Sequence, residues 1–357
     1  MDRVYFDNSA TTKVDERVLE AMRPYFLEKY GNASSLHTFG HEAYDALEMG
    51  RAQVAAAVNA APGDIIFTSG GTESDNLALQ GASFARVSKG KHIITSSVEH
   101  HAVLHTCQFL ETQGFKVTYL PVNAEGFVSV EELKNALTPE TTLVSIMMAN
   151  NEIGTIQHIR DLAEVSKDKG ALFMTDAVQA LTKTSVDVEK LNVDMLTMSA
   201  HKFHGPKGVG ALYLRKGVKL RPIIYGGGHE RGLRSSTENI PGIVGMGKAA
   251  ELGMAEMEES VERMTKIRDR LIDGTLTAVP RSYLNGPRSD GRLCNNAHFR
   301  FDYIEGEGMV LFLDMQGIAG STGSACSTKS LEPSHVLRSL GLRHEQCHGS
   351  LRLSLSK

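Results

Sequence analysis

The sequence contains no tryptophan and only four cysteines, Cys107, Cys294, Cys326 and Cys347. The cysteines are far apart and form no C-x-x-C pair, so the sequence indicates neither a disulfide framework nor a zinc ribbon. Free thiols are typical of a reducing cytoplasm. The ordinary interpretation of each such cysteine is a small, buried hydrophobic residue.

Long runs of lysine or arginine are also absent, and the 357 residues carry a formal net charge of −4. The chain therefore lacks the basic surface that nucleic acids and anionic membranes attract. No apolar stretch approaches the roughly 20 residues of a membrane-spanning helix, and residues 1–5 lack the basic-then-apolar layout of a signal peptide. We expect a soluble, cytoplasmic protein with no nucleic-acid or membrane partner.

What is present is typical of a globular protein, with 41% hydrophobic and 22% charged residues. Short apolar segments alternate with helix-length segments such as 72–88, 130–137 and 159–169. The predicted strands cover residues 65–67, 92–96, 117–121, 143–148, 172–175, 195–198 and 211–214. They are rich in Val, Ile, Leu and Met, as strands buried on both faces are. This alternation predicts an α/β fold with a mostly parallel, seven-stranded sheet covered by helices.

Two segments flank this predicted sheet. Residues 15–61 have a helical pattern, in which Val18, Leu19, Met22 and Phe26 form one apolar stripe. After Asn239 a long helical pattern continues to about Leu271. Beyond it we predict a strand at 293–301, a helix at 308–316 and a half-buried strand at 351–355.

The length allows about two domains. We expect a large domain of residues 1–245 and a smaller α+β C-terminal domain of residues 246–357. The first ~14 residues are candidates for packing with the small domain. In parallel sheets ligands bind beyond the carboxyl ends of the strands, so we expect the functional residues directly after the predicted strands.

The first candidate is Ser69-Gly70-Gly71-Thr72-Glu73, which follows a strand and begins a helix. Glycines let the backbone approach an anion closely, and the helix start offers free N–H groups and a positive dipole end. These features favour a phosphate site, but in isolation the signal is weak, because a Gly-Gly segment before a helix is more often only a turn. It matches neither the P-loop nor the G-x-G-x-x-G pattern.

The other candidates follow two further strands. Asp176 ends one strand, where a carboxylate serves either as a helix N-cap or as the counter-ion of a buried cation. Lys202 follows another strand beside His201, an environment that can lower the pKa of an amine nucleophile. The His201–His204 and His100-His101/His105 spacings allow a metal, but no nearby acidic triad completes such a site.

Together these motifs resemble the fold-type I pyridoxal-phosphate (PLP) enzymes of aminotransferase class V, and within them the NifS/IscS-type cysteine desulfurases. The resemblance covers almost the whole chain. It rests on the motifs at Tyr5–Thr12, Ser69–Ser74, Glu99-His100, Asn150–Gly154, Asp176–Gln179, Ser199–Lys202, Gly226–Gly232, Gly323–Ser327 and Ser350–Ser354.

The resemblance implies PLP as the cofactor and L-cysteine as the substrate. It implies that Lys202 binds PLP covalently and moves the substrate Cα proton, that Asp176 keeps the pyridine nitrogen protonated, and that His100 stacks on the ring as an acid/base group. The other implied contacts are Gln179 to the ring hydroxyl, Asn151 and Arg352 to the substrate carboxylate, and Gly71, Thr72, Ser199 and His201 to the phosphate. Thr237 would reach the phosphate of the neighbouring subunit, in a homodimer.

Cys326 decides the reaction, because an aminotransferase needs no such thiol. It lies in residues 320–330, which are too small and polar to pack a core, so we expect a mobile loop. The thiol would take the sulfur as a persulfide and supply it for iron–sulfur cluster assembly. Cys326 is also a candidate for a transient Fe–S ligand, and no other metal is expected. Residues 331–337 resemble the longer-loop desulfurases, which pass sulfur to scaffold proteins.

Several alternatives remain open at this point. Selenocysteine cleavage would use the same residues, and another class V reaction such as transamination would not need Cys326. A non-catalytic relative that serves as an assembly partner is disfavoured by the presence of Lys202, Asp176, His100 and Cys326. A nucleotide-binding α/β protein is disfavoured by the absence of both nucleotide fingerprints.

Overall fold

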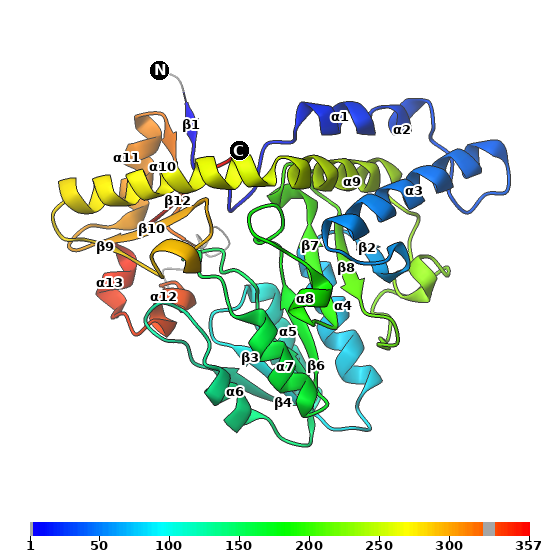
Figure 1. The fold of residues 1–357 in the computed structure, drawn as a ribbon, viewed down its shortest axis with the longest axis horizontal. Helices are drawn as coiled ribbons and strands as arrows, with labels where there is room; N and C mark the ends of the chain where they lie inside the picture. The colour runs from blue at the N-terminus through cyan, green and yellow to red at the C-terminus, as the bar shows by residue number, and fades with distance from the viewer. Residues whose placement is uncertain (1–2, 324–332) are drawn as a thin grey trace.

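A computed structural model describes residues 3–323 and 333–357 of the chain. Its centre is a seven-stranded sheet in the order β2-β8-β7-β6-β5-β3-β4 (Figure 1). The strands are β2 (Ile65–Thr68), β3 (His92–Ser96), β4 (Lys116–Leu120), β5 (Thr141–Ser145), β6 (Leu172–Asp176), β7 (Met195–Ser199) and β8 (Gly210–Leu214). All pairs are parallel except those that β8 makes with β2 and β7. The predicted sheet is confirmed.

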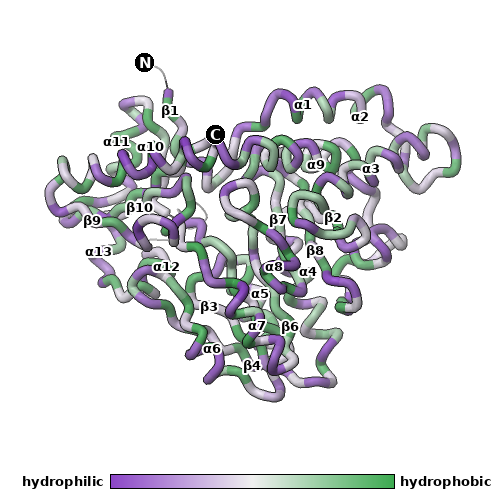
Figure 2. Tube along the Cα trace, viewed as in Figure 1, coloured by the Kyte–Doolittle hydropathy of each residue, from purple (hydrophilic) through white to green (hydrophobic). Residues whose placement is uncertain are grey.

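Helices cover both faces of this sheet. Alternating strand residues point to opposite faces, so Ile65 and Phe67 join one hydrophobic cluster whereas Ile66 joins another. The first cluster includes α3 (Thr38–Ala57), α7 (Ile159–Asp168) and α9 (Ile240–Ala255), and the second includes α4 (Gly71–Ala85) and α5 (His101–Thr112). In Figure 2 the hydrophobic colour is strongest in the strands and in α9.

The predicted apolar stripe of the first helix is confirmed for two of its four residues and wrong for the other two. The chain forms α1 (Glu16–Met22) and then α2 (Pro24–Leu27), and only Val18 and Met22 are buried. Leu19 is 54% exposed and Phe26 is 59% exposed. Pro24 begins a new helix, so the periodicity that would align Phe26 with Val18 is interrupted.

A second group of elements follows. The predicted long helix consists of two, α9 and α10 (Met257–Ala278), which meet at Glu256 and lie end to end in Figure 1. Under α10 lies an antiparallel sheet in the order β12-β10-β9. Its strands are β9 (Ser282–Leu284), β10 (Asn296–Phe301) and β12 (Ser350–Ser354), and α11 (Gly306–Met315) packs nearby.

The start of the chain lies beside this second group. β1 (Val4–Tyr5) pairs in parallel with β11 (Ile318–Ala319), and Asp7 forms a bridge with Ser354. The remaining helices are α6 (Val130–Ala136), α8 (Val188–Leu191), α12 (His335–Ser339) and α13 (His344–His348). Over the described ranges, no helix combines the length and the apolar character that crossing a membrane requires.

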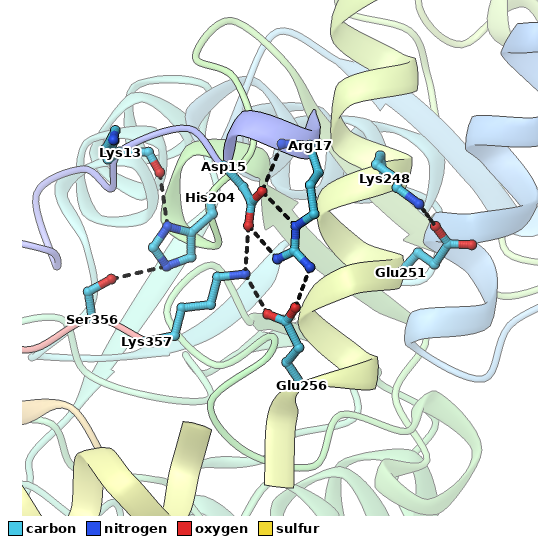
Figure 3. Close-up of polar contacts among 9 residues, drawn as sticks. All are labelled: Lys13, Asp15, Arg17, His204, Lys248, Glu251, Glu256, Ser356 and Lys357. Carbon is cyan, nitrogen blue, oxygen red and sulfur yellow. Dashed lines mark hydrogen bonds and ion pairs between the residues drawn. The ribbon is translucent and has the colours of Figure 1, made fainter. Parts of the chain in front are cut away.

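Four charged residues form a network at the joint between α9 and α10 (Figure 3). Lys357 donates to Asp15 at 3.0 Å and to Glu256 at 2.8 Å. Arg17 binds the same two carboxylates, with its closest contacts at 2.7 Å to each. These contacts hold the pKa of Asp15 well below its usual range, mainly through the hydrogen bond from Arg17. The network fixes α1 and the end of the chain to the joint.

We predict that Asp15→Asn lowers the thermal midpoint of the apoprotein by about 1–2 °C at pH 7. Asparagine is as good an N-cap as aspartate, so the variant removes mainly the charge. The folded-state pKa of Asp15 is lowered, so its contribution is present above the unfolded-state pKa of about 4 and is lost as the pH falls below it. The difference between variant and wild type should therefore shrink below about pH 4, as measured by calorimetry.

Glu16→Gln is the matched control, because the Glu16 carboxylate is 87% exposed and contacts only Lys13 at 3.5 Å. It should leave the midpoint unchanged. An equal shift in both variants would mean that overall charge, rather than the network, determines the effect.

Candidate active site

The predicted site residues meet in one cavity of ≈ 270 Å³ at the carboxyl ends of the parallel strands. Its lining includes Gly71, Thr72, His100, Asn151, Asp176, Gln179, Ser199, His201, Lys202 and Arg352. Two predicted residues are not there. Thr237 is described but exposed and does not line the cavity, and Cys326 lies outside the described residues. Parallel strands bring these residues together although they are spread over some 280 positions of the sequence.

Lys202 ends a short 3-10 turn directly after β7. Its Nζ donates to the carbonyl oxygens of Ser9 at 2.6 Å and Ala10 at 2.8 Å. The first of these oxygens also accepts a hydrogen bond from Gln179 Nε2 at 2.9 Å. The N-terminal segment therefore positions the candidate nucleophile and a candidate ring ligand together.

Asp176 is the last residue of β6 and is buried. Its Oδ1 accepts the backbone N–H of Val178 at 2.8 Å. Burial raises the pKa of Asp176 to about 6, and the Val178 N–H and the positive charge of Lys202 oppose that rise. A cation beside this carboxylate would stabilise its charged form.

The start of α4 provides a place for an anion. Gly70 precedes the helix without a side-chain cap, so backbone N–H groups of the first turn are available. A Cβ on Gly71 would lie 2.8 Å from Val178 Cγ2, so the close approach requires glycine. Ser199 and His201 line the same hollow, and Lys207 at its rim adds positive charge. The arrangement suits a phosphate.

His100 forms the N-cap of α5, and its Nδ1 accepts the backbone N–H of Ala102 at 3.1 Å. The neutral ring therefore carries its proton on Nε2. Burial lowers the pKa of His100 to about 4, and the charge of Lys202 lowers it further than the neighbouring histidines do. His100 is thus a neutral ring at physiological pH, suited to stacking and to proton transfer.

Arg352 reaches the cavity from β12 of the second group. Its guanidinium is 2% exposed and binds Asp7 Oδ1 at 2.9 Å and the carbonyl oxygen of Asn151 at 3.0 Å. Its Nε is buried and has no hydrogen-bond partner within the part of the chain that the structure describes. A buried donor without a partner is costly, and a carboxylate in the cavity would satisfy it.

Of the histidines predicted as conceivable metal ligands, His201 and His204 bind separate partners, whereas the rings of His101 and His105 stack with their centroids 4.9 Å apart. His201 contacts Thr11 Oγ1 at 3.2 Å, whereas His204 contacts the carbonyl oxygen of Lys13 at 2.9 Å. Within residues 3–323 and 333–357, no group of three or more His, Cys, Asp or Glu side chains is arranged to hold a metal ion.

The family model "Aminotransferase class-V" matches residues 4–357. The chain belongs to the aminotransferase class-V family. Among curated members, it is 57% identical to "Cysteine desulfurase IscS" of Clostridium botulinum, over 99% of this chain and 89% of that protein. It is 56% identical to the protein of the same name from Methanosarcina thermophila, over 99% of this chain and 87% of that protein.

Solved class-V structures agree with the fold. A "NIFS-LIKE PROTEIN" superposes with a TM-score of 0.93 at 43% identity, covering 99% of this chain and 93% of that one. The structure "SspA in complex with cysteine" superposes with a TM-score of 0.87 at 37% identity, covering 99% of this chain and 98% of that one. The predicted fold type is confirmed.

The cofactor of these class-V enzymes is PLP, and the cavity fits it. Gln179 Oε1 and Ser9 Oγ are buried without hydrogen-bond partners, which suits the polar substituents of the ring. The close approach at Gly71 suits the phosphate, and the Lys202 amine suits the aldehyde. When bound, PLP supplies an electron sink that stabilises a carbanion next to the substrate amine.

Sequence reasoning missed other residues of the cavity. Ser9 and Ala10 act through carbonyl oxygens, and every residue has one, so no side-chain pattern marks them. Glu152 lies within the Asn150–Gly154 motif, but the sequence indicated no role for its side chain. His335 begins α12, and its ring lies 4.7 Å from that of His101, centroid to centroid.

We predict that Lys202→Met raises the pKa of His100 in the apoprotein, because a nearby positive charge is removed. The value should remain below 6.5, because burial is the larger cause of its depression. Imidazole chemical shifts of isotope-labelled histidine, assigned with His100→Asn, measure the change.

Lys207→Met is the matched control, since Lys207 lowers the pKa of His201 and is not among the groups that act on His100. It should leave the His100 titration unchanged. A His100 pKa that stays constant or falls in Lys202→Met would contradict the electrostatic argument.

Proposed function

We infer that the chain is a PLP-dependent cysteine desulfurase that converts L-cysteine to L-alanine and takes the sulfur as a persulfide on Cys326. The observation that carries this proposal is the convergence of Lys202, Asp176, His100 and Arg352 on one cavity. The names of relatives that are 50–57% identical over nearly the whole chain support the same reaction.

The surroundings of each side chain in the cavity indicate its role. Lys202 is held at the cavity wall by two carbonyl oxygens, and its amine would attach PLP and move the substrate Cα proton. Asp176 would bind the ring nitrogen, and Gln179 would bind the ring hydroxyl through its Oε1, which has no hydrogen-bond partner among the described residues. The neutral His100 would stack on the ring and exchange protons through Nε2.

Arg352 and Asn151 bind the carboxylate of the substrate. Arg352 is fixed by Asp7 and by the carbonyl of Asn151, so its free Nε has a defined direction. It binds the substrate carboxylate in a charge-assisted hydrogen bond, and the Asn151 side chain completes the contact.

The sulfur step joins the substrate to Cys326. The bond between the substrate sulfur and its carbon breaks, a sulfur–sulfur bond to Cys326 forms, and the carbon takes a proton to give alanine. Both described flanks of residues 324–332 contact the cavity residue Glu152. Ser334 Oγ donates to Glu152 Oε2 at 2.5 Å, and a Cβ on Gly323 would lie 3.0 Å from the same oxygen.

We predict that Cys326→Ser abolishes sulfur transfer while PLP binding is retained. Sulfide and alanine formation from L-cysteine with a reductant should fall at least ~10²-fold, as is typical for the loss of a catalytic group. The absorption spectrum of bound PLP should still change on adding L-cysteine, because the substrate site is intact.

Cys347→Ala is the control, since Cys347 is a buried core residue in α13 and is not required for transfer. Unchanged production of both sulfide and alanine by Cys326→Ser would refute the assignment. A keto acid in place of alanine in the wild-type reaction would instead favour transamination.

We propose that the enzyme is a homodimer in which Thr237 completes the phosphate site of the partner. Thr237 is exposed and lies away from its own cavity. Its segment is anchored beside the phosphate hollow, because Arg234 binds Glu73 of α4 at 2.8 Å. The PLP phosphate carries about two negative charges and needs several donors.

Exposed apolar side chains support a protein interface. Five of them lie on α1, on α2 and in the segment that follows α2, and one directly precedes Gly226. They are Leu19, Phe26, Leu27, Tyr30, Leu36 and Tyr225, with exposed fractions from 54% to 92%. Burying such side chains against a second copy of the chain would remove their apolar surface from water.

We predict that Thr237→Ala weakens PLP retention and that mixing it with Lys202→Ala restores activity. If Thr237 serves the partner, one site of the mixed dimer carries both lesions and the other is intact. Activity should recover to roughly a quarter of wild type after statistical exchange of equal amounts, because half of the dimers are mixed and each has one intact site.

Ser236→Ala, at the exposed neighbouring position, is the control and should retain PLP normally. No recovery in the mixture would place Thr237 in its own chain's site. A fully active monomer in light scattering would exclude the dimer.

We also propose an iron–sulfur scaffold protein or another sulfur acceptor as a partner, and a cytoplasmic location. The free buried cysteines support the location. We further propose two domains. The predicted boundary at residue 245 lies inside α9, and the break at Glu256 is a more natural place for it.

A further inference from the structure

Asp75 is a buried carboxyl group for which the mechanism above has no role. It lies on α4, one turn after Thr72, and is 1% exposed. Thr197 Oγ1 lies 2.8 Å from its Oδ1, and in this hydrogen bond Thr197 is the donor when Asp75 is ionised and the acceptor when Asp75 is protonated. The hydrogen bond that the structure gives Asp75 is thus to a neutral hydroxyl group.

The same hydroxyl group also serves Asp176. Thr197 on β7 is the register partner of Asp176 on β6, and directly paired residues of neighbouring strands point to the same face of a sheet. The Thr197 hydroxyl group lies close enough to lower the pKa of Asp176. Thr197 therefore stands between two buried carboxyl groups.

A hydroxyl group has one proton to donate and can accept another hydrogen bond at its oxygen. If both carboxyl groups were ionised, only one could receive the proton of Thr197, and two buried negative charges would repel each other. One shared proton removes this conflict, provided that it stays on the carboxyl group farther from the ligand.

We propose that Asp75 is a positioning residue that carries this proton and donates it to Thr197 Oγ1, so that Thr197 donates to Asp176 and holds it as an anion. The proposal rests on the proposed function of Asp176 as the partner of the PLP ring nitrogen. The chain Asp75–Thr197–Asp176 fixes both the charge and the direction of that carboxylate.

The surroundings favour the proton on Asp75. Burial raises the pKa of Asp75 well above its usual range, the charge of Asp176 raises it further, and the Thr197 hydroxyl group only partly opposes that rise. Glu99 is also near, and its Oε1 already accepts from Ser96 at 2.6 Å and from the Met147 N–H at 2.9 Å. Asp176 has the Val178 N–H and the charge of Lys202 to stabilise its ionised form, although burial opposes this.

The first test measures PLP affinity of the apoprotein. In Asp75→Asn the side-chain amide donates as a protonated carboxyl group does, so the affinity should stay within about threefold of wild type. Asp75→Ala and Thr197→Val break the chain and should weaken PLP binding about tenfold or more, as expected for losing a hydrogen bond to a charged group. Thr197→Ser restores the hydroxyl group and should rescue the affinity.

Thr175→Val is the matched control. Thr175 is the buried neighbour of Asp176 on the same strand, and its hydroxyl group has no hydrogen-bond partner. Its replacement should leave PLP affinity unchanged. Equal losses in Thr175→Val and Thr197→Val would reduce the effect to general packing and overturn the proposal.

The second test detects the proton itself. Infrared spectra of apoprotein labelled with [4-¹³C]aspartate separate protonated aspartate from the buried glutamates. The wild type at pH 7 should show one protonated aspartate band that is absent in Asp75→Asn. A band that persists in Asp75→Asn, or an Asp75→Asn that binds PLP as weakly as Asp75→Ala, would overturn the proposal.

The PLP affinity and the infrared band are both measured without the desulfuration reaction. If the wild type bound PLP but produced no alanine or sulfide from L-cysteine, the proposed function would fail while the affinity series and the infrared band could still agree with the proton chain. If the wild type desulfurated cysteine but the affinity series were flat, only the proton chain would fail.

Discussion

The geometry of the active site depends on the hydrogen bonds that the carbonyl oxygen of Ser9 accepts. It accepts hydrogen bonds from Lys202 and from Gln179, which follow different strands of the large sheet. The same residue is tied to the second group of elements, because its N–H donates to Ser354 Oγ at 2.8 Å. Asp7, two residues earlier, fixes Arg352. A short N-terminal segment thus sets the spacing between the cofactor site and the substrate site.

Most of the large sheet could be predicted, because all its strands except β4 are buried on both faces and leave continuous apolar runs in the sequence. Residues at the strand ends, such as Asp176 and Lys202, could be found for the same reason. Leu19 and Phe26 could not be placed, since periodicity identifies an apolar stripe but not what covers it. The break at Glu256 was also missed, because the helical pattern continues through it.

The role of Arg352 could not be predicted from the residue pattern alone. Nothing in an alternating strand of residues 351–355 indicates a substrate ligand, and its role was predicted only through resemblance to a family. Its unpartnered Nε supplies the physical reason afterwards. Thr197 and Asp75 were invisible for a different reason, since they meet through register and helix packing across 122 positions of sequence.

The N-terminal segment has a consequence for how the protein is made. Asp7 and Ser9 find their partners at Arg352 and Ser354, which the ribosome adds some 345 residues later. The seven strands of the large sheet are all complete by Leu214, so much of that domain can fold during synthesis. The ordered cavity must wait for the last strand, because contacts so distant in sequence close late. The wall that Ser9 forms in the cavity therefore gains its anchor to Ser354 only after the strands of the large sheet have been synthesised.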